Sequence, residues 1–557
     1  MSLLMTVGNT IISALVDNGI DTVFGIPGTQ TLPMNKAIAG RDDIEYVMSR
    51  HETAVTQEAW GYAETTGRPA TTLVVPGPGD MNAMNGLKNA FNDCTPLIHF
   101  SIETEPEYRG GDAIHETPPD TYDNVIKENI HVKNPEGTLA EVERAIATAE
   151  TPPKGPVRIG IPRNFLQQET DLASPGHISR ENVTSLPEGK VEQTRNIITA
   201  ASEPVIIAGG GVRTAGAADK LVSVAERLDA PVFHTHKGKG IIAEDHRLSA
   251  GLTFAGSVQA LRDVLARADG ILAVGNDFDI LATHSWSLDI DEDHLVHINL
   301  NPDDIGTGYS PALSIVADVS DVLEALEEQL PDNSETGPHP RVAPISEARE
   351  EVLAPLREQR EPPLNSVVAL DAIQEALPRD AIVTADSGGS RLWTLAAFDA
   401  YGPSRYLNTG SWASMGTGLP GAIGAQVGSE GPPAVSIVGD GGAMMAIHEL
   451  HTIATEGIPV TVVVLNNSDY AIISDSAENK FDIDREEYAW RESPLNFQDI
   501  SSGMGVRATR AETPDEIVDG VAAAAESDRP RLVEIPTDPD EPQAIGYMME
   551  AGPAFED

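Results

Sequence analysis

The sequence predicts an α/β protein made of three doubly wound domains, each with a parallel sheet. Short β-branched runs alternate with longer helical patterns along the whole chain, which is typical of parallel strands joined by helices. The length of 557 residues corresponds to about three domains at roughly 100–200 residues each. The 49 glycines and 40 prolines are spread along the chain, so the composition is that of a globular protein.

Two stretches look like linkers between the domains. Residues 168–190 are polar and carry Pro175 and Pro187, and residues 331–363 hold seven prolines. Because proline and polar clusters interrupt regular structure, these stretches predict domains at residues 1–167, 190–330 and 364–545. Residues 1–19 read as a helix, because they lack the basic segment and the cleavage site of a signal peptide.

The chain is strongly acidic, with a net charge of −49. This charge disfavours nucleic acid and anionic membranes as partners, and no apolar run reaches the roughly 18 residues that a membrane span requires. The acidic side chains could form a binding surface, or they could form a solvated surface suited to high salt. Their even spread favours the second, halophilic interpretation. Cys94 is the only cysteine, so a disulfide within the chain is excluded and a cytoplasmic location is expected.

The sharpest motif lies in the last predicted domain. Residues 434–438 read as a buried strand, residues 439–442 as a glycine turn, residues 443–456 as a helix ending at Gly457, and residues 459–465 as a second buried strand. A right-handed crossover brings the ends of both strands to one edge of the sheet. Asp440 and Asn467 are therefore expected to be neighbours in space.

That edge of an α/β sheet is where ligands bind. A turn formed by Gly439, Asp440, Gly441 and Gly442 exposes backbone N–H groups that suit a phosphate. Asp440 and Asn467 supply oxygen ligands of the kind that Mg²⁺ takes beside substrate phosphates. A plain strand–helix turn is the alternative for Gly-Asp-Gly alone, and the Asn-Asn pair after the next strand favours a diphosphate and Mg²⁺.

Gly-Asp-Gly followed by Asn-Asn resembles the thiamine diphosphate (ThDP) motif. The resemblance implies that Asp440 and Asn467 bind Mg²⁺ through their side chains and that Asp469 binds it through its carbonyl. No Gly-Lys-Ser/Thr follows the turn, so the motif is not a P-loop.

The N-terminal third resembles the acetolactate synthase large subunit. Residues 44–48 read as a strand, and His51-Glu52 opens a helix running to about Thr66. Arg50-His51-Glu52, followed by Gly61-Tyr62-Ala63 and Thr66-Gly67, matches the family pattern. By resemblance Glu52 is the glutamate that hydrogen-bonds to the cofactor's pyrimidine. Alone, a carboxylate at a helix N-terminus would be explained by the helix dipole. Residues 24–28, ending at Gly28, and Gly77-Pro78-Gly79 with Asn82 match the same family in order.

Residues 411–425 form a further match to this family, whose methionine here is Met415. By resemblance Met415 bends the cofactor, rather than only filling a core, and residues 386–390 form a loop that contacts the diphosphate. The family's Gln-His pair in that loop is replaced by Gly389 and Ser390. The full set of expected cofactor-binding residues is Gly28, Glu52, Gly77, Asn82, Ser387, Gly388, Gly389, Ser390, Ala413, Met415, Gly439, Asp440, Gly441, Gly442 and Asn467.

The middle third resembles the domain that holds FAD in flavin-containing relatives, but it departs from them. Asn276-Asp277 stands where those relatives have Thr-Arg, and Thr253-Phe254 stands where they have Met-His. These departures favour a chain without FAD. His234 and His236 have no third ligand nearby in sequence and are interpreted as structural.

The expected substrate pocket also departs from the synthases. Ile102-Glu103-Thr104-Glu105 and Ile114-His115-Glu116 replace the family's Gly-Gln-Val-Pro and Phe-Gln-Glu. Glu103 and His115 are therefore candidate catalytic residues. An imidazole near the reacting carbon could act as a general acid, which would favour release of an aldehyde; the equal alternative for His115 is a surface-loop histidine.

The resemblance as a whole implies a ThDP- and Mg²⁺-dependent enzyme that decarboxylates a 2-oxo acid and joins the product to a second carbonyl, as an acetolactate synthase does. A 2-oxo acid decarboxylase without ligation is the first alternative, and a flavin-dependent oxidase or a degenerate regulatory protein is less favoured. The family's architecture implies a homodimer or homotetramer with the active site at a subunit interface.

Overall fold

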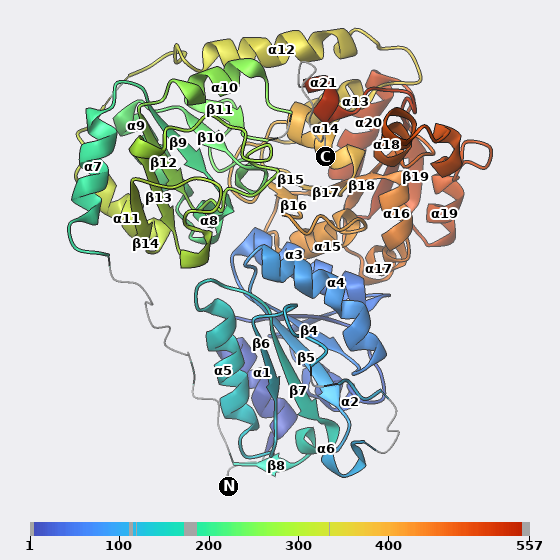
Figure 1. The fold of residues 1–557 in the computed structure, drawn as a ribbon. Helices are drawn as coiled ribbons and strands as arrows, with labels where there is room; N and C mark the ends of the chain where they lie inside the picture. The colour runs from blue at the N-terminus through green and yellow to red at the C-terminus, as the bar shows by residue number, and fades with distance from the viewer. Residues whose placement is uncertain are drawn as a thin grey trace.

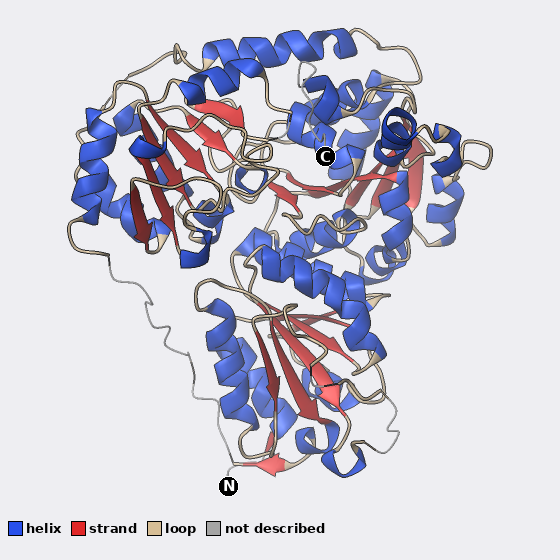
Figure 2. Cartoon of the chain, in the orientation of Figure 1, coloured by secondary structure: helices blue, strands red, loops and turns tan. Residues whose placement is uncertain are grey.

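The computed structural model describes residues 5–110, 115–118, 120–171, 176, 186–254, 256–333 and 335–548. Figures 1 and 2 show three sheets, each flanked by helices, one for each third of the chain. Each of these sheets has six strands, and every pair within them is parallel. The predicted α/β class with three doubly wound parallel sheets is confirmed.

The first sheet has the strand order β3-β2-β4-β5-β7-β6. Its central strand β4 is buried along its whole length, as expected of a parallel sheet covered on both faces. The strands are β2 (Thr22–Gly25), β3 (Glu45–Met48), β4 (Ala70–Val74), β5 (Leu97–Glu103), β6 (Glu128–His131) and β7 (Val157–Pro162). The helices are α1 (Val7–Asp17), α2 (Leu32–Ile38), α3 (Glu52–Thr66), α4 (Pro78–Asn92), α5 (Thr138–Glu150) and α6 (Arg163–Leu166). A short pair, β1 (Met5–Thr6) with β8 (Glu169–Thr170), is antiparallel.

The middle sheet has the order β11-β10-β9-β12-β13-β14. Its strands are β9 (Pro204–Ala208), β10 (Val232–His234), β11 (Ser249–Leu252), β12 (Gly270–Val274), β13 (Leu295–Asn299) and β14 (Leu313–Val316). Its helices are α7 (Lys190–Ala200), α8 (Gly210–Thr214), α9 (Ala218–Leu228), α10 (Gln259–Ala266) and α11 (Val319–Glu327). Residues 331–363, expected to be only a linker, contain helix α12 (Ala343–Arg357), which buries Ile345, Leu353 and Leu356.

The third sheet has the order β16-β15-β17-β18-β20-β19. Its strands are β15 (Ile382–Ala385), β16 (Tyr406–Asn408), β17 (Ala434–Gly439), β18 (Thr461–Asn466), β19 (Arg507–Arg510) and β20 (Arg531–Pro536). Its helices are α13 (Ser366–Ala376), α14 (Gly389–Ala397), α15 (Gly418–Gly428), α16 (Asp440–Ala446), α17 (Glu449–Glu456), α18 (Ala471–Phe481), α19 (Phe497–Gly503), α20 (Pro514–Ala525) and α21 (Ala544–Met548).

The predicted strand–helix–strand unit is present, with one difference in its helix. The helix begins directly at Asp440 and divides into α16 and α17, where one helix over residues 443–456 was expected. Gly457 ends α17 in the left-handed conformation, with φ of 72°, as a glycine after a helix commonly does. Gly439 pairs with Leu465, so the residues that follow β17 and β18 emerge at the same edge.

The first and third sheets are joined through helices α3 and α15, which lie against one another (Figure 1). One buried cluster contains Trp60 and Tyr62 from α3 together with Leu419 and Ile423 from α15. The two domains therefore share a core within one chain. Among the helices of the described ranges, none combines the length and the apolarity needed to cross a bilayer.

Candidate functional site

A cavity of about 160 Å³ lies at the carboxyl edge of the third sheet. It gathers residues that follow three neighbouring strands, β15, β17 and β18, at the edge where α/β sheets bind ligands. Of the expected cofactor-binding and metal-binding residues, those that line it are Ser387, Gly388, Gly389, Ser390, Met415, Gly439, Asp440, Gly441, Gly442, Asn467 and Asp469. Residues from Ser387 to Asp469, more than 80 positions apart in sequence, thus form one wall of the cavity.

Asp440 is a deeply buried carboxylate in this wall, with 2% of its surface exposed. Its oxygens accept hydrogen bonds from the backbone N–H of Gly441 at 3.0 Å and of Ser468 at 2.8 Å. Burial nevertheless raises its pKa to about 7, because these bonds only partly offset the cost of desolvating the charge. A divalent cation at this carboxylate would supply the missing compensation, so the donor set fits Mg²⁺.

Asn467 and Asp469 differ in which atoms remain for a ligand. The side-chain oxygen of Asn467 accepts the N–H of Asp469 at 3.1 Å. The carboxylate of Asp469 is held by Ser474 and by Arg491, the latter at 3.1 Å. Its side chain is therefore committed to the protein, which suits the expectation that Asp469 would use its backbone carbonyl.

Hydrogen bonds to Asp386 hold the loop at residues 386–390 in place. This fully buried carboxylate accepts the backbone N–H groups of Gly416, Thr417 and Gly418 at 2.8–3.0 Å. Burial raises its pKa to about 6 in spite of those bonds. Asp386 thereby ties the loop to the segment that carries Met415. Gly388 has a φ of 115°, a conformation that side chains rarely adopt.

Sequence reasoning missed the part of the wall that comes from the chain after β20. Thr537, Glu541 and Gln543 line the cavity, and Ser366 joins them from the start of α13. Glu541 accepts the Ser366 N–H and hydroxyl, both at 2.6 Å. Thr537 directly follows a parallel strand, so the rule that ligands lie beyond strand ends could have identified this segment. The other lining residues that were missed are Leu465, Tyr470, Ala471, Ile472 and Ile473.

The expected pyrimidine-side residues gather at the corresponding edge of the first sheet. Glu52 begins α3 after β3, and it accepts the side-chain N–H of Asn82 at 3.0 Å. The Gly77 turn follows β4, with φ of 66°, and a Cβ on Gly79 would lie 3.5 Å from a Glu52 oxygen. Of the described residues that line the third-sheet cavity, none precedes Ser366. Gly28, Glu52, Gly77 and Asn82 are therefore not part of that cavity in a single chain, and Ala413 is not among its lining residues either.

His115 lies next to this N-terminal group. A Cβ on Gly77 would stand 2.9 Å from the His115 Cα, and the His115 Nδ1 is 3.5 Å from the Gln30 amide nitrogen. Thr117 fastens the same loop, because its hydroxyl accepts the Gly77 N–H at 2.6 Å and donates to Asp80 at 2.6 Å. His115 thus lies against the turn at Gly77, and Gly79 two residues later lies beside Glu52.

Glu103 is placed differently from His115, because basic side chains surround its carboxylate. Its carboxylate contacts Arg109, Arg158 at 3.0 Å and His131 at 2.9 Å. Burial opposes its ionisation, but the hydrogen bond from His131 and the arginine charges lower its pKa on balance. A carboxylate held in the charged form by three partners is an anchor for β5 and not a proton donor.

The middle domain carries a second cavity, of about 260 Å³, beyond the ends of β9, β12 and β13. Burial, together with the charges of neighbouring carboxylates, raises the pKa values of Asp277 and Asp304, which line it, to about 6. Lys237 also lines it, but its ammonium pairs with Asp93 at 2.8 Å and Glu64 at 3.3 Å. A pyrophosphate in this cavity would lie beside the carboxylates of Asp277 and Asp304, which disfavours FAD, while Lys154 and Arg213 also line the wall.

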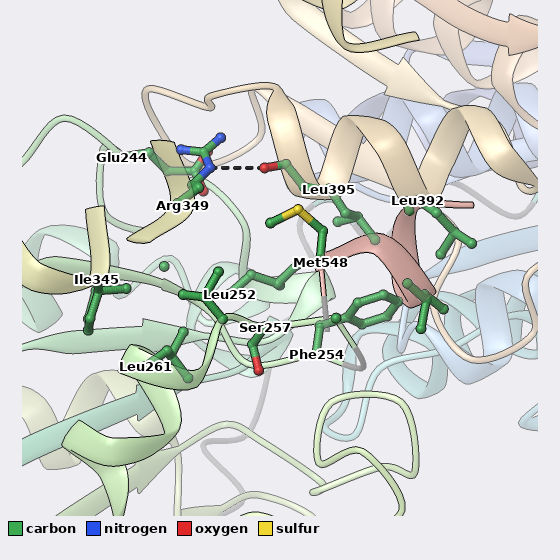
Figure 3. A pocket seen from close by; sticks show the side chains of 17 residues that line it. Glu244, Leu252, Phe254, Ser257, Leu261, Ile345, Arg349, Leu392, Leu395 and Met548 are labelled. Atoms are coloured by element: carbon green, nitrogen blue, oxygen red, sulfur yellow. Dashed lines mark hydrogen bonds between the residues drawn. The ribbon is translucent and has the colours of Figure 1, made fainter. Parts of the chain in front are cut away.

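A third, mostly apolar cavity of about 70 Å³ lies between the middle and third domains (Figure 3). Leu252, Phe254, Ile345 and Met548 line it, and the Arg349 Nε donates to the Ala396 carbonyl at 2.9 Å. None of the expected site residues lines it. It is a packing gap between domains.

Three family models match the chain in order. A thiamine pyrophosphate enzyme N-terminal TPP binding domain matches residues 5–125, a thiamine pyrophosphate enzyme central domain matches residues 191–326, and a thiamine pyrophosphate enzyme C-terminal TPP binding domain matches residues 386–535.

Curated relatives are similar over nearly the whole chain. A probable acetolactate synthase large subunit of Methanocaldococcus jannaschii is 28% identical over 544 residues, which is 95% of this chain and 92% of that protein. A probable 2-ketoarginine decarboxylase of Pseudomonas aeruginosa is 30% identical, covering 84% of this chain and 82% of that protein. The solved 4-hydroxybenzoylformate decarboxylase of Rhodococcus jostii RHA1 shares the fold, with a TM-score of 0.82, 24% identity, and coverage of 96% and 99%.

Proposed function

The chain belongs to the family of thiamine pyrophosphate enzymes, and from this premise we propose that it decarboxylates a small 2-oxo acid with ThDP and Mg²⁺ and joins the product to a second carbonyl. The observation that carries the proposal is the third-sheet cavity, which unites the Gly439–Gly442 turn, Asp440, Asn467 and Met415 in one wall. The similarity to acetolactate synthase large subunits supports the ligation step.

The two ends of the cofactor would be held by different parts of the protein. Asp440 and Asn467 would hold Mg²⁺ through side-chain oxygens, with the Asp469 carbonyl as a further ligand. The N–H groups at the start of α16 and the loop at Ser387–Ser390 would hold the diphosphate, since a helix N-terminus favours anions. Met415 lines the same wall and would shape the bound cofactor.

When bound, ThDP supplies a nucleophilic carbon and holds the negative charge left by the departing CO₂. Glu52 would accept a hydrogen bond at the pyrimidine end and so control the protonation of that ring. Its carboxylate is oriented by the Asn82 side chain at 3.0 Å. The protein's other task is to exclude water from the reacting centre.

We propose that the active site forms between two chains of a homodimer or homotetramer. Glu52 and the residues around it lie at the edge of the first sheet, and the described residues that line the third-sheet cavity of the same chain all come from Ser366 onward. A cofactor that must touch Glu52 and Asp440 would therefore bridge the first domain of one chain and the third domain of its partner. A two-fold arrangement gives two equivalent sites.

Decarboxylation without ligation is a second candidate, and the position of His115 favours it. His115 lies against the Gly77 turn, close to the end of α3 where Glu52 stands, and would face the bound substrate. An imidazole there can donate the proton that releases an aldehyde. The similarity to a probable 2-ketoarginine decarboxylase points the same way. Glu103, which contacts two arginines and His131, would fix the strand beneath this loop.

FAD is not part of the proposal, because the acidic wall of the middle cavity does not suit a pyrophosphate. Purified protein is therefore expected to be colourless. The single cysteine is in keeping with a cytoplasmic location.

The test is to incubate the protein with pyruvate, ThDP and Mg²⁺ and to identify the products by NMR. Acetolactate supports ligation, acetaldehyde supports the second candidate, and no turnover of any 2-oxo acid in a panel contradicts both. Asp440→Ala should abolish metal-dependent ThDP binding measured by calorimetry. Asp269→Asn is a matched control, because Asp269 also accepts two backbone N–H groups, at 2.9 and 2.7 Å, but lies in the middle domain.

A further inference from the structure

Helix α17 of the third domain accepts hydrogen bonds from the backbone immediately before Glu52. The Glu449 carboxylate accepts the N–H of Arg50 at 3.0 Å and the N–H of His51 at 3.1 Å. His51 is the N-cap of α3, and Glu52 is its first residue. The first turn of a helix leaves its N–H groups without partners inside the helix, so a carboxylate from another domain fixes where α3 begins.

The side chain of Arg50 makes further contacts with α17. Its Nε lies 2.8 Å from the His451 ring nitrogen, and a terminal nitrogen donates to the Thr455 hydroxyl at 2.7 Å. The His51 and His448 rings stand 5.5 Å apart. Three positions of α17 therefore contact the two residues before Glu52, and we name this set (Glu449, His451 and Thr455 with Arg50 and His51) the α17 clasp.

Glu449 has a second carboxyl beside it, that of Glu58 on α3. Both side chains are fully buried, and Glu58 contacts the Ser49 hydroxyl at 2.5 Å. Within the described part of the chain, the other Glu58 oxygen has no hydrogen-bond partner. Burial raises the pKa values of both groups, and the Glu449 charge raises that of Glu58 further. The titratable groups that face the pair are Arg50, His51 and His448, whose Nε2 lies 3.3 Å from a Glu449 oxygen.

Two adjacent buried carboxyls cannot both be ionised without a large cost. Glu449 accepts N–H groups from Arg50 and His51 and the hydroxyl of Thr452, so it is the member that carries the charge. Glu58, with its unpartnered oxygen, is the member that carries the proton.

We propose that Glu449 is a positioning residue for Glu52: through the α17 clasp, the third domain of each chain sets the place of its own pyrimidine-side glutamate. This inference rests on the proposed function, because it gives Glu52 its role. It also links the two sites of a dimer. The segment from Asp440 to Glu449 is continuous through α16 and α17, so in each chain it connects the Asp440 of one site to the Glu52 of the other site.

The first measurement needs no cofactor. Backbone amide hydrogen exchange of the peptide at residues 48–53 is compared in the wild-type protein and in Glu449→Ala, Glu449→Gln and Asp269→Asn. Loss of the carboxylate should release the amides of Arg50 and His51, raising their exchange rates about 10-fold or more. Asp269→Asn should leave this peptide unchanged.

The second measurement follows deuterium exchange at C2 of bound ThDP by NMR, with ThDP affinity determined in parallel. Glu449→Ala should slow C2 exchange by about 100-fold, as expected for a misplaced catalytic group, while ThDP affinity changes less than threefold. Glu449→Gln keeps an oxygen acceptor and should fall between Ala and wild type. Glu58→Gln, which replaces a protonated carboxyl by a neutral amide, should exchange at close to the wild-type rate.

The outcomes separate the two proposals. If Glu52→Gln does not slow C2 exchange, or the wild-type protein does not accelerate it over free ThDP, the proposed function fails. If Glu52→Gln abolishes exchange while folded Glu449→Ala exchanges C2 at the wild-type rate, the clasp is rejected. Should Glu449→Ala not fold, Glu449→Gln decides, because wild-type amide and C2 exchange in that variant overturns the inference.

Discussion

Three carboxyl groups in or directly behind the wall of the third-sheet cavity, Asp386, Asp440 and Glu541, have raised pKa values for one reason. The carboxyl group of each is largely removed from solvent, and the hydrogen bonds that each accepts come from neutral groups. Neutral donors offset only part of the desolvation of a charge. A cavity edged by such groups is suited to a ligand that brings its own cation.

Glu541 provides the clearest test of this effect. Burial raises its pKa from the ordinary value of 4.5 to about 7. The folded protein then holds a proton that the unfolded chain has lost, so this group's contribution to stability is complete below pH 4.5 and is lost as the pH rises through 7. Glutamine has no such dependence. Glu541→Gln should therefore melt at a higher temperature than wild type at pH 8 and at nearly the same temperature at pH 5. Equal differences at the two pH values would contradict the assignment.

At the scale of elements, the contact between α3 and α15 fixes the first domain on the third. The helices approach so closely that a Cβ on Gly424 would lie 1.8 Å from the Glu58 carbonyl, and one on Gly61 would lie 2.1 Å from the Gly421 carbonyl. The atoms that an added Cβ would meet belong to the backbone, which cannot move aside as a flexible side chain can. This contact also holds Glu58 against Glu449, so it supports the α17 clasp.

Gly424→Ala is expected to destabilise the protein by about 3 kcal/mol or more, because it forces two packed helices apart. Denaturant unfolding measures the change. Gly503→Ala is the control: Gly503 is the last residue of α19, and a Cβ there meets nothing within 4 Å, so that variant should be neutral or slightly more stable. Similar losses in both variants would show that the close approach is not the cause.

At the scale of the whole molecule, the two halves of the proposed site lie on separate domains of the chain. Exposed apolar side chains accompany both halves: Met81 near Asn82, and Met444, Met445 and Ile473 near Asp440 and Asp469 are each 40–54% exposed. Apolar surface of this kind is a common feature of subunit interfaces.

Complementation between inactive variants tests the shared site. Glu52→Gln mixed with Asp440→Ala, under conditions that exchange subunits, should regain up to one working site of two, since each mixed dimer contains one intact pair of domains. Asp440→Ala mixed with Asn467→Ala should regain nothing, because both changes lie in the same half. Absence of recovery in the first mixture, with subunit exchange demonstrated, would reject the interface.

The net charge of −49 also acts on the whole molecule. Self-repulsion is screened over about 30 Å at 0.01 M salt and about 3 Å at 1 M. Stability and activity are therefore expected to rise toward molar salt. Thermal unfolding across a salt series measures this, and equal stability in dilute buffer would exclude the halophilic interpretation.

The sequence by itself was sufficient for the α/β class, for the unit around Asp440 and Asn467, and for α3 beginning at Glu52. These depend on local periodicity, glycine turns and strand ends, which neighbouring residues dictate. Tertiary structure alone decided that Glu103 contacts two arginines and His131, that Glu541 and Gln543 line the cavity, and that Glu449 holds the backbone before Glu52. Glu449 and Arg50 are 399 positions apart in the chain, and such a contact depends on how domains dock, which no local pattern encodes.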